Sequence, residues 1–329
     1  MPRTVTLLEG IRSHVSAGTE VIYARGCDTI DPSTSGIDAA VVAARDADVA
    51  IVAIGGRSGL VDGATSGESS DAADLGLPGV QQELVEAIAA TGTPVVAVIV
   101  SGRPLALPWI AEHVAAIVYA WVPGEEGGNA LADILFGDVS PAARLPITLP
   151  RDVGQVPLFY NHKPSGGRSQ WRTDYTDLPS SPLFAFGHGL SYTTFDYSNL
   201  SIRPQRVEAT GTTEISIDVR NSGERAGDEV VQLYIHDVVA SVTRPVKQLA
   251  GFARITLGPG ESRTVVFDLD LSQLAFYDRD MQLVVEPGDV DILIGASSED
   301  IRATDRIAIT GSRRRLRRDE ITPTRVSVR

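Results

Sequence analysis

Two carboxylates in a glycine-started loop are the side chains of this sequence best placed to do chemistry. Glu68 and Asp71 lie in the segment Ser-Gly-Glu-Ser-Ser-Asp, between an apolar run at residues 49–54 and an amphipathic pattern that begins at Pro78. Loops at the carboxyl ends of strands are where α/β proteins commonly place reactive groups. A carboxyl group held there can donate or accept a proton in general acid–base catalysis. On residue type alone, a solvated loop carboxylate is the simpler interpretation of Glu68.

The elements that must position this loop are predicted to form an α/β domain. Three apolar runs, at 49–54, 94–100 and 115–120, show no alternation, which is typical of parallel strands buried on both faces. Further patterns predict helices over residues 4–16, 37–47, 78–90 and 125–136, and a short strand over residues 21–24. Strands that alternate with helices favour a doubly wound α/β fold with a mostly parallel sheet.

The C-terminal half of the chain has a different hydrophobic period. From about residue 212, apolar residues such as Ile215, Ile217 and Val219 alternate with polar ones. Short alternating runs separated by Gly-Pro-Gly and Pro-Gly-Asp turns predict an all-β sandwich. The arginine-rich run at 313–318 favours a solvated segment. We therefore expect an α/β domain over residues 1–150, a linker over 151–200, a sandwich over 201–311 and a basic tail over 312–329.

The composition argues against several classes of function. The chain has 329 residues, enough for about two or three domains, and a formal net charge of -13, which argues against a nucleic-acid partner. No run of about 18 apolar residues predicts a membrane helix. No leader-like apolar run follows the N-terminus, so a cytoplasmic location is expected unless a longer parent protein is exported.

Cysteine and histidine usage gives no sign of a metal or a cofactor. Cys27 is the only cysteine, which rules out an intrachain disulfide and favours a packing thiol. The five histidines do not recur at metal-ligand spacing, so no metal site is expected. The sequence also has no phosphate loop and no dinucleotide fingerprint, so no cofactor is expected.

Four ordered motifs carry a family resemblance. They are the acidic loop with its continuation Leu-Pro-Gly-Val-Gln at 77–81, Ser-Gly-Arg-Pro at 101–104, Pro-Gly-Glu-Glu-Gly-Gly at 123–128 followed by Arg-Leu-Pro-Ile-Thr-Leu-Pro at 144–150, and Phe-Gly-His-Gly-Leu-Ser-Tyr-Thr-Thr-Phe at 186–195. In this order they resemble the C-terminal part of family 3 glycoside hydrolases, the β-glucosidases and β-xylosidases. The resemblance implies an α/β sandwich domain followed by a fibronectin type III-like domain.

The resemblance also implies parts that these residues do not contain. Enzymes of this family carry their nucleophilic aspartate on an N-terminal (β/α)8 barrel, which takes roughly 250 residues. The family pattern places a further strand and helix ahead of residue 1, so we expect the α/β domain to lack its first strand. The implied partners are a β-linked glycoside or oligosaccharide and a barrel-bearing chain or a second copy, with neither nucleic acid nor membrane.

By this resemblance, Glu68 is the catalytic acid/base. The family commonly reads Gly-Glu-Gly-x-Asp-Arg in this loop, whereas the present sequence has Ser69 in place of the second glycine and Ala72 in place of the arginine. The lost arginine removes a positive charge that could hold Asp71. Asp71 itself is interpreted as a residue that orders the loop or caps the following helix.

Other polar residues receive more modest interpretations. His162 and Lys163 lie in a linker segment, residues 161–165, that resembles one branch of the family. Together with Trp171, whose aromatic face suits packing against a sugar, they could contact substrate; a packed interdomain loop is an equally good interpretation. Glu125 and Glu126 suit the N-terminus of a helix and need no catalytic role. Gly127 and Gly128 are interpreted as sites of close helix packing, and His188 as a hydrogen-bonded structural histidine.

Three hypotheses for function follow. The first is the C-terminal portion of a retaining β-glucosidase or β-xylosidase that hydrolyses terminal, non-reducing β-linked sugars. The second is a non-catalytic module that binds carbohydrate or a partner, and the third is an inactive fragment. On its own the chain is expected to lack glycosidase activity, because one carboxylic acid without a nucleophile cannot complete the retaining mechanism.

Overall fold

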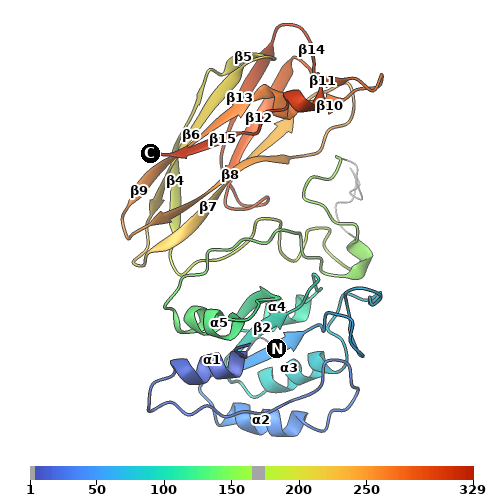
Figure 1. The fold of residues 1–329 in the computed structure, drawn as a ribbon, viewed down its shortest axis with the longest axis vertical. Coiled ribbons are helices and arrows are strands. Elements are labelled where there is room, and N and C mark those ends of the chain that lie inside the picture. The colour runs from blue at the N-terminus through green and yellow to red at the C-terminus, as the bar shows by residue number, and fades with distance from the viewer. Residues whose placement is uncertain (1–3, 165–174) are drawn as a thin grey trace. The chain divides into compact units, whose positions relative to one another are not determined.

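The computed structural model describes residues 4–164 and 175–329, which form two compact units (Figure 1). The first unit runs to Val139 and includes Leu149–Pro157, and the second comprises Ser140–Thr148 and Leu158–Arg329. This division differs from the boundary expected at residue 150. The reason is visible in the backbone: the Leu145 N–H donates to the His188 carbonyl at 2.8 Å, and the Gly187 N–H donates to the Leu145 carbonyl at 2.8 Å.

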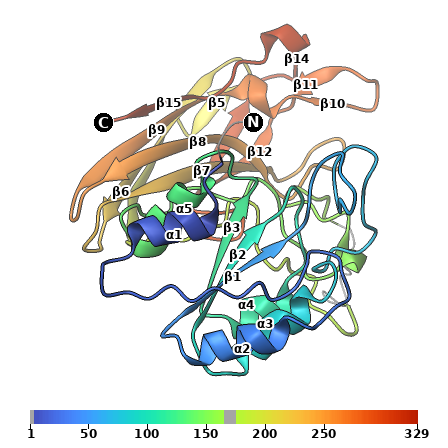
Figure 2. The same cartoon turned by 60° about the horizontal axis from the view of Figure 1, so that its bottom comes forward.

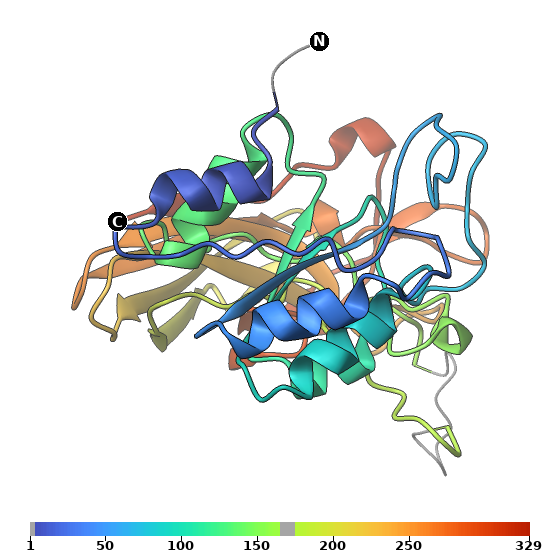
Figure 3. The same ribbon diagram turned by 90° about the horizontal axis from the view of Figure 1, so that it is seen from below.

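The first unit is a parallel α/β arrangement. Its elements are α1 (Leu7–His14), α2 (Ile37–Arg45), β1 (Ala50–Gly55), α3 (Gln81–Ala89), β2 (Val95–Val100), α4 (Pro108–His113), β3 (Ala116–Trp121), α5 (Gly127–Phe136) and the 3-10 turn η1 (Val153–Gln155). The strands pair in parallel in the order β1-β2-β3. Helices α1 and α5 lie on one face of the sheet, and α2, α3 and α4 lie on the other (Figures 2 and 3). The predicted α/β class is confirmed.

The pairing of α1 with α5 depends on two glycines. A Cβ added to Gly10 would lie 2.1 Å from the Gly128 carbonyl oxygen, and one added to Gly128 would lie 2.1 Å from the Thr6 carbonyl oxygen. The N-terminus of α1 is fixed by a capping box between Thr6 and Glu9, which satisfies amides that the helix leaves unpaired. Gly128 therefore has the close-packing role predicted for it.

The outer strands of this sheet are less buried than the sequence predicts. The central strand β2 is largely buried, with Val98 and Ile99 inaccessible to solvent. In β1, however, Ala53 is exposed, and no residue of β3 is fully buried. The prediction that all three strands are buried on both faces is wrong for β3 and in part for β1, because each lies at an edge of the sheet.

The strand predicted at residues 21–24 does not form. Its only nearby strand-type contact is an isolated bridge between Gly26 and Gly36. A strand needs a partner for its peptide groups, and none of the described segments pairs with residues 21–24.

A glutamine side chain covers part of the free edge of β1. Ala50 and Gly56 donate their N–H groups to carbonyls of Pro94 and Val100, so the intervening odd-numbered residues point their peptide groups away from β2. At Gly55 the Gln81 amide exchanges two hydrogen bonds with the backbone, accepting from its N–H and donating to its carbonyl, both at 2.8 Å. Gln81 thereby occupies the position that a peptide group of a neighbouring strand would take.

The second unit is an all-β sandwich, as predicted. Its strands are β4 (Phe195–Arg203), β5 (Arg206–Glu208), β6 (Thr212–Asn221), β7 (Gly227–Asp237), β8 (Gln248–Leu257), β9 (Ser262–Asp270), β10 (Phe276–Tyr277), β11 (Leu283–Val285), β12 (Gly288–Gly295), β13 (Ile301–Thr310), β14 (Arg314–Arg315) and β15 (Arg325–Val328), with short turns η2 (Leu271–Leu274) and η3 (Arg318–Glu320). The sheet orders are β5-β13-β12-β7-β8, β15-β9-β6-β4 and β10-β11-β14. Buried residues alternate with others along β6, and the inward-facing side chains of the strands form one continuous hydrophobic core.

The expected basic tail at residues 312–329 is part of the sandwich. Strand β15 pairs with β9, and β14 pairs with β11. The arginines of this region are neutralised locally: Arg313 is ion-paired with Asp278, and Arg317 with Asp319. The segment is therefore not a separate tail, because its backbone pairs with strands of the sandwich. Most of its arginines are nevertheless exposed, as expected of a solvated run. No helix within residues 4–164 and 175–329 is long and apolar enough to cross a membrane.

Candidate active site

Glu68 lies at the tip of a tight turn within the acid loop, which we define as residues 57–72. The Ser70 N–H donates to the Gly67 carbonyl at 3.3 Å, which closes a turn over Glu68 and Ser69. Gly67 has φ 122 and Ser69 has φ 62. A non-glycine residue in the left-handed region is strained. Ser69 occupies the position where the family motif has glycine, so the substitution retains the glycine-like backbone and carries its steric cost.

Short contacts close the base of the acid loop. The Thr65 N–H donates to the Arg57 carbonyl at 2.7 Å, and the hydroxyl groups of Ser58 and Ser66 are 2.8 Å apart. Gly102, in the loop after β2, lies directly against this base, since a Cβ added there would lie 2.5 Å from the Ser58 hydroxyl oxygen. The loops that follow two neighbouring strands are therefore packed together where the acid loop begins.

Arg103 places a positive charge beside Asp71, where the sequence has Ala72 instead of the arginine of the family motif. Its Nη1 lies 2.5 Å from Asp71 Oδ1 and donates to the Ala72 carbonyl at 2.8 Å. Asp71 Oδ1 also accepts from the Ala72 N–H at 2.8 Å. Asp71 thus has the contacts of a loop-ordering residue and does not cap α3, which begins at Gln81. The loss of the family arginine at Ala72 is compensated in space from a different loop.

The backbone of Arg103 is itself fixed. Its carbonyl accepts from the Ser101 hydroxyl at 2.8 Å and from the Tyr119 hydroxyl at 2.7 Å, and the same phenol accepts from the Leu105 N–H at 3.0 Å. Burial raises the pKa of Tyr119 to about 12, so the phenol stays protonated and able to donate. Sequence reasoning missed Arg103 as a site residue, although its position after the run at 94–100 placed it at the same sheet edge as the acid loop.

The Glu68 side chain is open to solvent. It is exposed and makes no hydrogen bond or ion pair with the residues that the structure describes. The fold therefore orders the loop through Asp71 and leaves the neighbouring carboxyl group unengaged. Such a group can transfer a proton to or from a partner brought against the loop, and an unliganded geometry is no argument against that role.

His162 and Lys163 are the residues predicted to bind substrate that the structure describes. His162 and Lys163 belong to the second unit: His162 Nδ1 is 2.7 Å from the Lys163 carbonyl oxygen, and the Lys163 ammonium donates to the Thr243 carbonyl. The hollow beside His162 has a volume of about 10 Å³, which leaves room for no more than a water molecule. Trp171 lies outside the described residues.

His188 is packed as a structural residue, but its ring makes none of the predicted hydrogen bonds within the described residues. Its ring stacks on Phe184 with a centroid distance of 5.2 Å. Burial, together with the positive charge of Arg144, lowers the pKa of His188. The imidazole is therefore held in its neutral form, which suits a packed ring in a turn.

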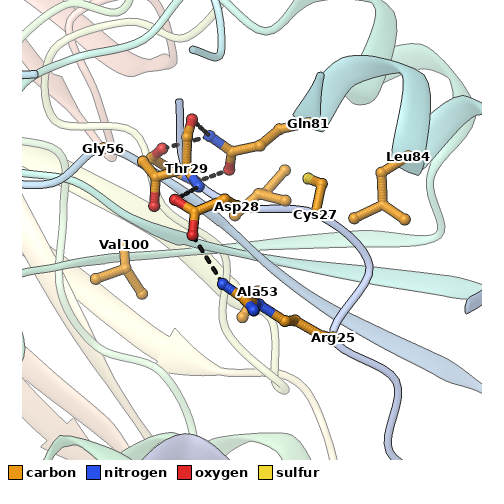
Figure 4. A pocket seen from close by; sticks show the side chains of 11 residues that line it. Arg25, Cys27, Asp28, Thr29, Ala53, Gly56, Gln81, Leu84 and Val100 are labelled. Atoms are coloured by element: carbon orange, nitrogen blue, oxygen red, sulfur yellow. Dashed lines mark hydrogen bonds and ion pairs between the residues drawn. The ribbon is translucent and has the colours of Figure 1, made fainter. Parts of the chain in front are cut away.

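A separate pocket of about 200 Å³ opens at the carboxyl ends of β1 and β2. Figure 4 shows that its polar groups are directed at one another: Arg25 Nη2 donates to Asp28 Oδ2 at 2.9 Å, and Gln81 bonds to the backbone. Burial raises the pKa of the Cys27 thiol that lines it, as expected of a packing thiol. Glu68 is not among the lining residues, and we assign no catalytic role to this pocket.

The fold combines an α/β unit, which has an acidic loop at a strand end, with a β-sandwich. The comparisons agree. Residues 1–192, more than half of the chain, match the model described as the glycosyl hydrolase family 3 C-terminal domain, and residues 229–298 match a fibronectin type III-like domain. The chain belongs to glycosyl hydrolase family 3.

Similar proteins are β-xylosidases and β-glucosidases. A beta-xylosidase of Formosa agariphila is 44% identical over 301 residues, which are 91% of this chain and 40% of that protein. A periplasmic beta-glucosidase of Salmonella typhimurium is 38% identical, over 91% of this chain and 42% of that protein. A solved β-glucosidase of Erythrobacter marinus superimposes with a TM-score of 0.84 at 38% identity, over 94% of this chain and 43% of that one. The chain thus spans about 40% of the length of the curated relatives it matches.

Proposed function

We propose that this chain supplies the general acid/base of a retaining β-glucosidase or β-xylosidase, and that Glu68 has that role. The observation that carries the proposal is that the two carboxylates of the acid loop, Asp71 and Glu68, have different surroundings. Arg103 engages Asp71, and the base of the loop is closed by short contacts, while Glu68 stays unengaged at the tip. Family membership supports the reaction class.

The chemistry divides between two carboxyl groups. In a retaining glycosidase they lie about 5–5.5 Å apart, one attacking the anomeric carbon while the other protonates the departing glycosidic oxygen. The second then takes a proton from water, which displaces the enzyme carboxylate and releases the sugar. In this proposal Glu68 performs both proton transfers, and the nucleophilic carboxylate belongs to a (β/α)8 barrel outside these 329 residues. The substrate is a terminal, non-reducing β-linked sugar.

We also propose that the segment around His162 and Lys163 contributes to sugar binding. His162 uses Nδ1 for its contact with the Lys163 carbonyl, and its Nε2 has no partner within the described residues, so it can bond a sugar hydroxyl. Lys163 is held by Thr243, which fixes the direction of the segment. Trp171 is kept as a third candidate because an aromatic face packs well against sugar CH groups.

The test is a complementation assay. The chain is combined with a separately expressed family 3 barrel, and hydrolysis is measured on an aryl β-glycoside with a good leaving group and on an alkyl β-glycoside with a poor one. Glu68→Ala should lower the rate on the alkyl substrate by roughly 100- to 10,000-fold. The loss on the activated aryl substrate should be smaller, because its leaving group needs little protonation.

A matched control and a chemical rescue complete the test. Asp62→Asn removes one negative charge from the same exposed loop and should leave both rates nearly unchanged. Added azide should restore turnover of Glu68→Ala on the activated substrate by attacking the glycosyl-enzyme intermediate without base assistance. Equal losses on both substrates, with no rescue, would count against Glu68 as the acid/base. Sugar binding without turnover under any condition would favour a binding module.

A further inference from the structure

Two carboxylates and a histidine converge at one end of the α1–α5 pair. His14 ends α1, Asp133 lies in α5, and Asp138 follows it. His14 Nε2 is 2.7 Å from Asp138 Oδ2 and 3.5 Å from Asp133 Oδ1. These three atoms all lie within 4.8 Å of one another. This group cannot be predicted from ligand spacing, because His14 is far along the chain from the two aspartates.

The backbone that carries the cluster is well fixed. Helices α1 and α5 touch through Gly10 and Gly128, and the Val5 N–H donates to the Glu125 carbonyl at 2.9 Å. After α5, Gly137 adopts φ 82, and the Asp138 N–H donates back to the Asp133 carbonyl at 2.9 Å. This left-handed helix cap turns Asp138 back beside Asp133.

The orientation of the imidazole is also restricted. The His14 ring stacks on Phe136 with a centroid distance of 5.4 Å and an interplanar angle of 19°. Its Nε2 side therefore faces the two carboxylates while the ring face is covered. The side chains need only small adjustments to meet at a common point.

The charge balance of the cluster favours a bound cation. Both carboxylates lie at the C-terminal end of α5, where the helix dipole is unfavourable to negative charge, and α5 has no basic residue in its last turn. Among the described residues, His14 is the only basic side chain paired with either of them. One imidazolium can neutralise one carboxylate, whereas a divalent ion bound to a neutral imidazole neutralises both.

We propose that His14, Asp133 and Asp138 form a binding site for a divalent transition-metal ion, with Zn²⁺ the best match. An imidazole nitrogen and two carboxylate oxygens are donors that zinc accepts at about 2.0–2.2 Å, which places tetrahedral donors roughly 3.3 Å apart. The separation of 3.5 Å between His14 and Asp133 already suits this geometry, and Asp138 must withdraw slightly from contact with the imidazole. A nitrogen ligand disfavours Mg²⁺ and Ca²⁺, which prefer all-oxygen shells. Water completes the coordination, and the ion joins the ends of two helices.

The experiment is isothermal titration of the purified, tag-free chain with ZnCl₂, repeated with Co²⁺ to record its visible spectrum. We expect one saturable site per chain, and Co²⁺ absorption with the intensity of a four-coordinate complex. Asp133→Asn and Asp138→Asn conserve side-chain shape, and each should weaken binding at least about tenfold, because each removes an anionic ligand. Circular dichroism verifies that the variants are folded.

The controls use groups of the same type elsewhere in the first unit. His113→Gln and Asp46→Asn change a helix-end histidine and a helix-end aspartate outside the cluster and should leave the affinity unchanged. Zn²⁺ should raise the melting temperature of wild type and not that of Asp138→Asn. The proposal is overturned by the absence of saturable binding, by binding that the two cluster variants do not weaken, or by equal affinity for Ca²⁺. None of these outcomes depends on glycosidase activity.

Discussion

The two units of this chain differ in how deeply their β-strands are buried. In the sandwich, Ile215, Ile217 and Val219 of β6 are inaccessible to solvent, because facing strands cover them. In the parallel sheet, Ala53 of β1 is exposed and β3 has no fully buried residue. Both units bury apolar side chains, for example Val98 and Ile110 in the α/β unit. The α/β unit adds specific contacts at its periphery, such as the Gly10–Gly128 contact and the Gln81 amide.

This difference predicts which substitutions should destabilise each unit most. A sandwich with a closed core should fail when a buried charge is left without its partner. The α/β unit should fail at the single contacts that hold its helices and loops. Trp109 and Trp121 lie in the α/β unit, so in a Trp171→Phe background tryptophan fluorescence reports on that unit, while far-ultraviolet circular dichroism also follows the sandwich.

The largest effect is expected from Arg144→Ala. Arg144 Nη2 lies 3.0 Å from Glu229 Oε1, with side-chain exposures of 7% and 6%. Removing one partner leaves a buried charge uncompensated, which should lower the free energy of unfolding by about 3–5 kcal/mol. Urea denaturation followed by circular dichroism measures the change. The control Arg254→Ala breaks a more exposed pair with Asp228 and should cost only about 0–1 kcal/mol. Equal losses in the two variants would contradict the closed-core interpretation.

Gly128→Ala should produce the next largest effect, and only in the α/β unit. The new Cβ would lie 2.1 Å from the Thr6 carbonyl oxygen, so α1 must move away from α5. Such overpacking should cost about 1–3 kcal/mol, measured as a shift of the tryptophan-detected urea midpoint. Gly18→Ala is the matched control, because a Cβ there meets nothing within 4 Å. A Gly128→Ala protein with an unchanged midpoint would show that the helix pair is dispensable.

Arg103→Ala should barely change global stability. Its partner Asp71 is 81% exposed at the side chain, and exposed pairs contribute about 0–1 kcal/mol. The effect should instead be local: backbone amides of residues 65–72 should exchange hydrogen faster, while those of β2 keep their rates. Asp71→Asn should give the same exchange pattern. Uniform exchange changes across the α/β unit would contradict a loop-specific role for this ion pair.

The smallest effect is a pH slope in the sandwich unit. Burial lowers the pKa of His188 in the fold, so the unfolded state binds its proton more readily. The stability that this provides is complete above the unfolded pKa of about 6.5 and declines as the pH falls through that value and towards the lower folded pKa. Comparing urea midpoints at pH 7.5 and 5.5 should show a smaller decline in His188→Phe than in wild type. An equal decline in the two proteins would contradict this role of the His188 imidazole.

Features that depend on neighbouring residues could be predicted from the sequence, whereas features that depend on contacts between distant segments could not. Period-two alternation predicted the sandwich strands, because alternation directly records which side chains face the core. Continuous apolar runs located all three parallel strands, yet overstated the burial of β3, since position within a sheet is not written in a strand's own residues. The arginine run at 313–318 was misinterpreted as a tail because the strand that pairs with Arg314 and Arg315, β11, lies elsewhere in the sequence.

The residues of the candidate site could likewise be predicted only where a local motif contains them. Glu68 was identified from its motif and its position after a strand, and the structure places it at the tip of an ordered turn. Arg103 was not identified, because its role depends on two loops that meet at neighbouring strand ends. The group formed by His14, Asp133 and Asp138 was also missed, since sequence spacing detects only ligands on one element.

Gln81 has a further consequence, for solubility. An open strand edge is a template on which a second molecule can add a strand, and such pairing leads to aggregation. By bonding both peptide groups of Gly55, Gln81 leaves only Ile51 and Ala53 of β1 to offer backbone groups along this edge, whereas strands commonly pair over about 5–6 residues. This shielding is made of neutral hydrogen bonds, so unlike protection by surface charge it persists at high salt concentration.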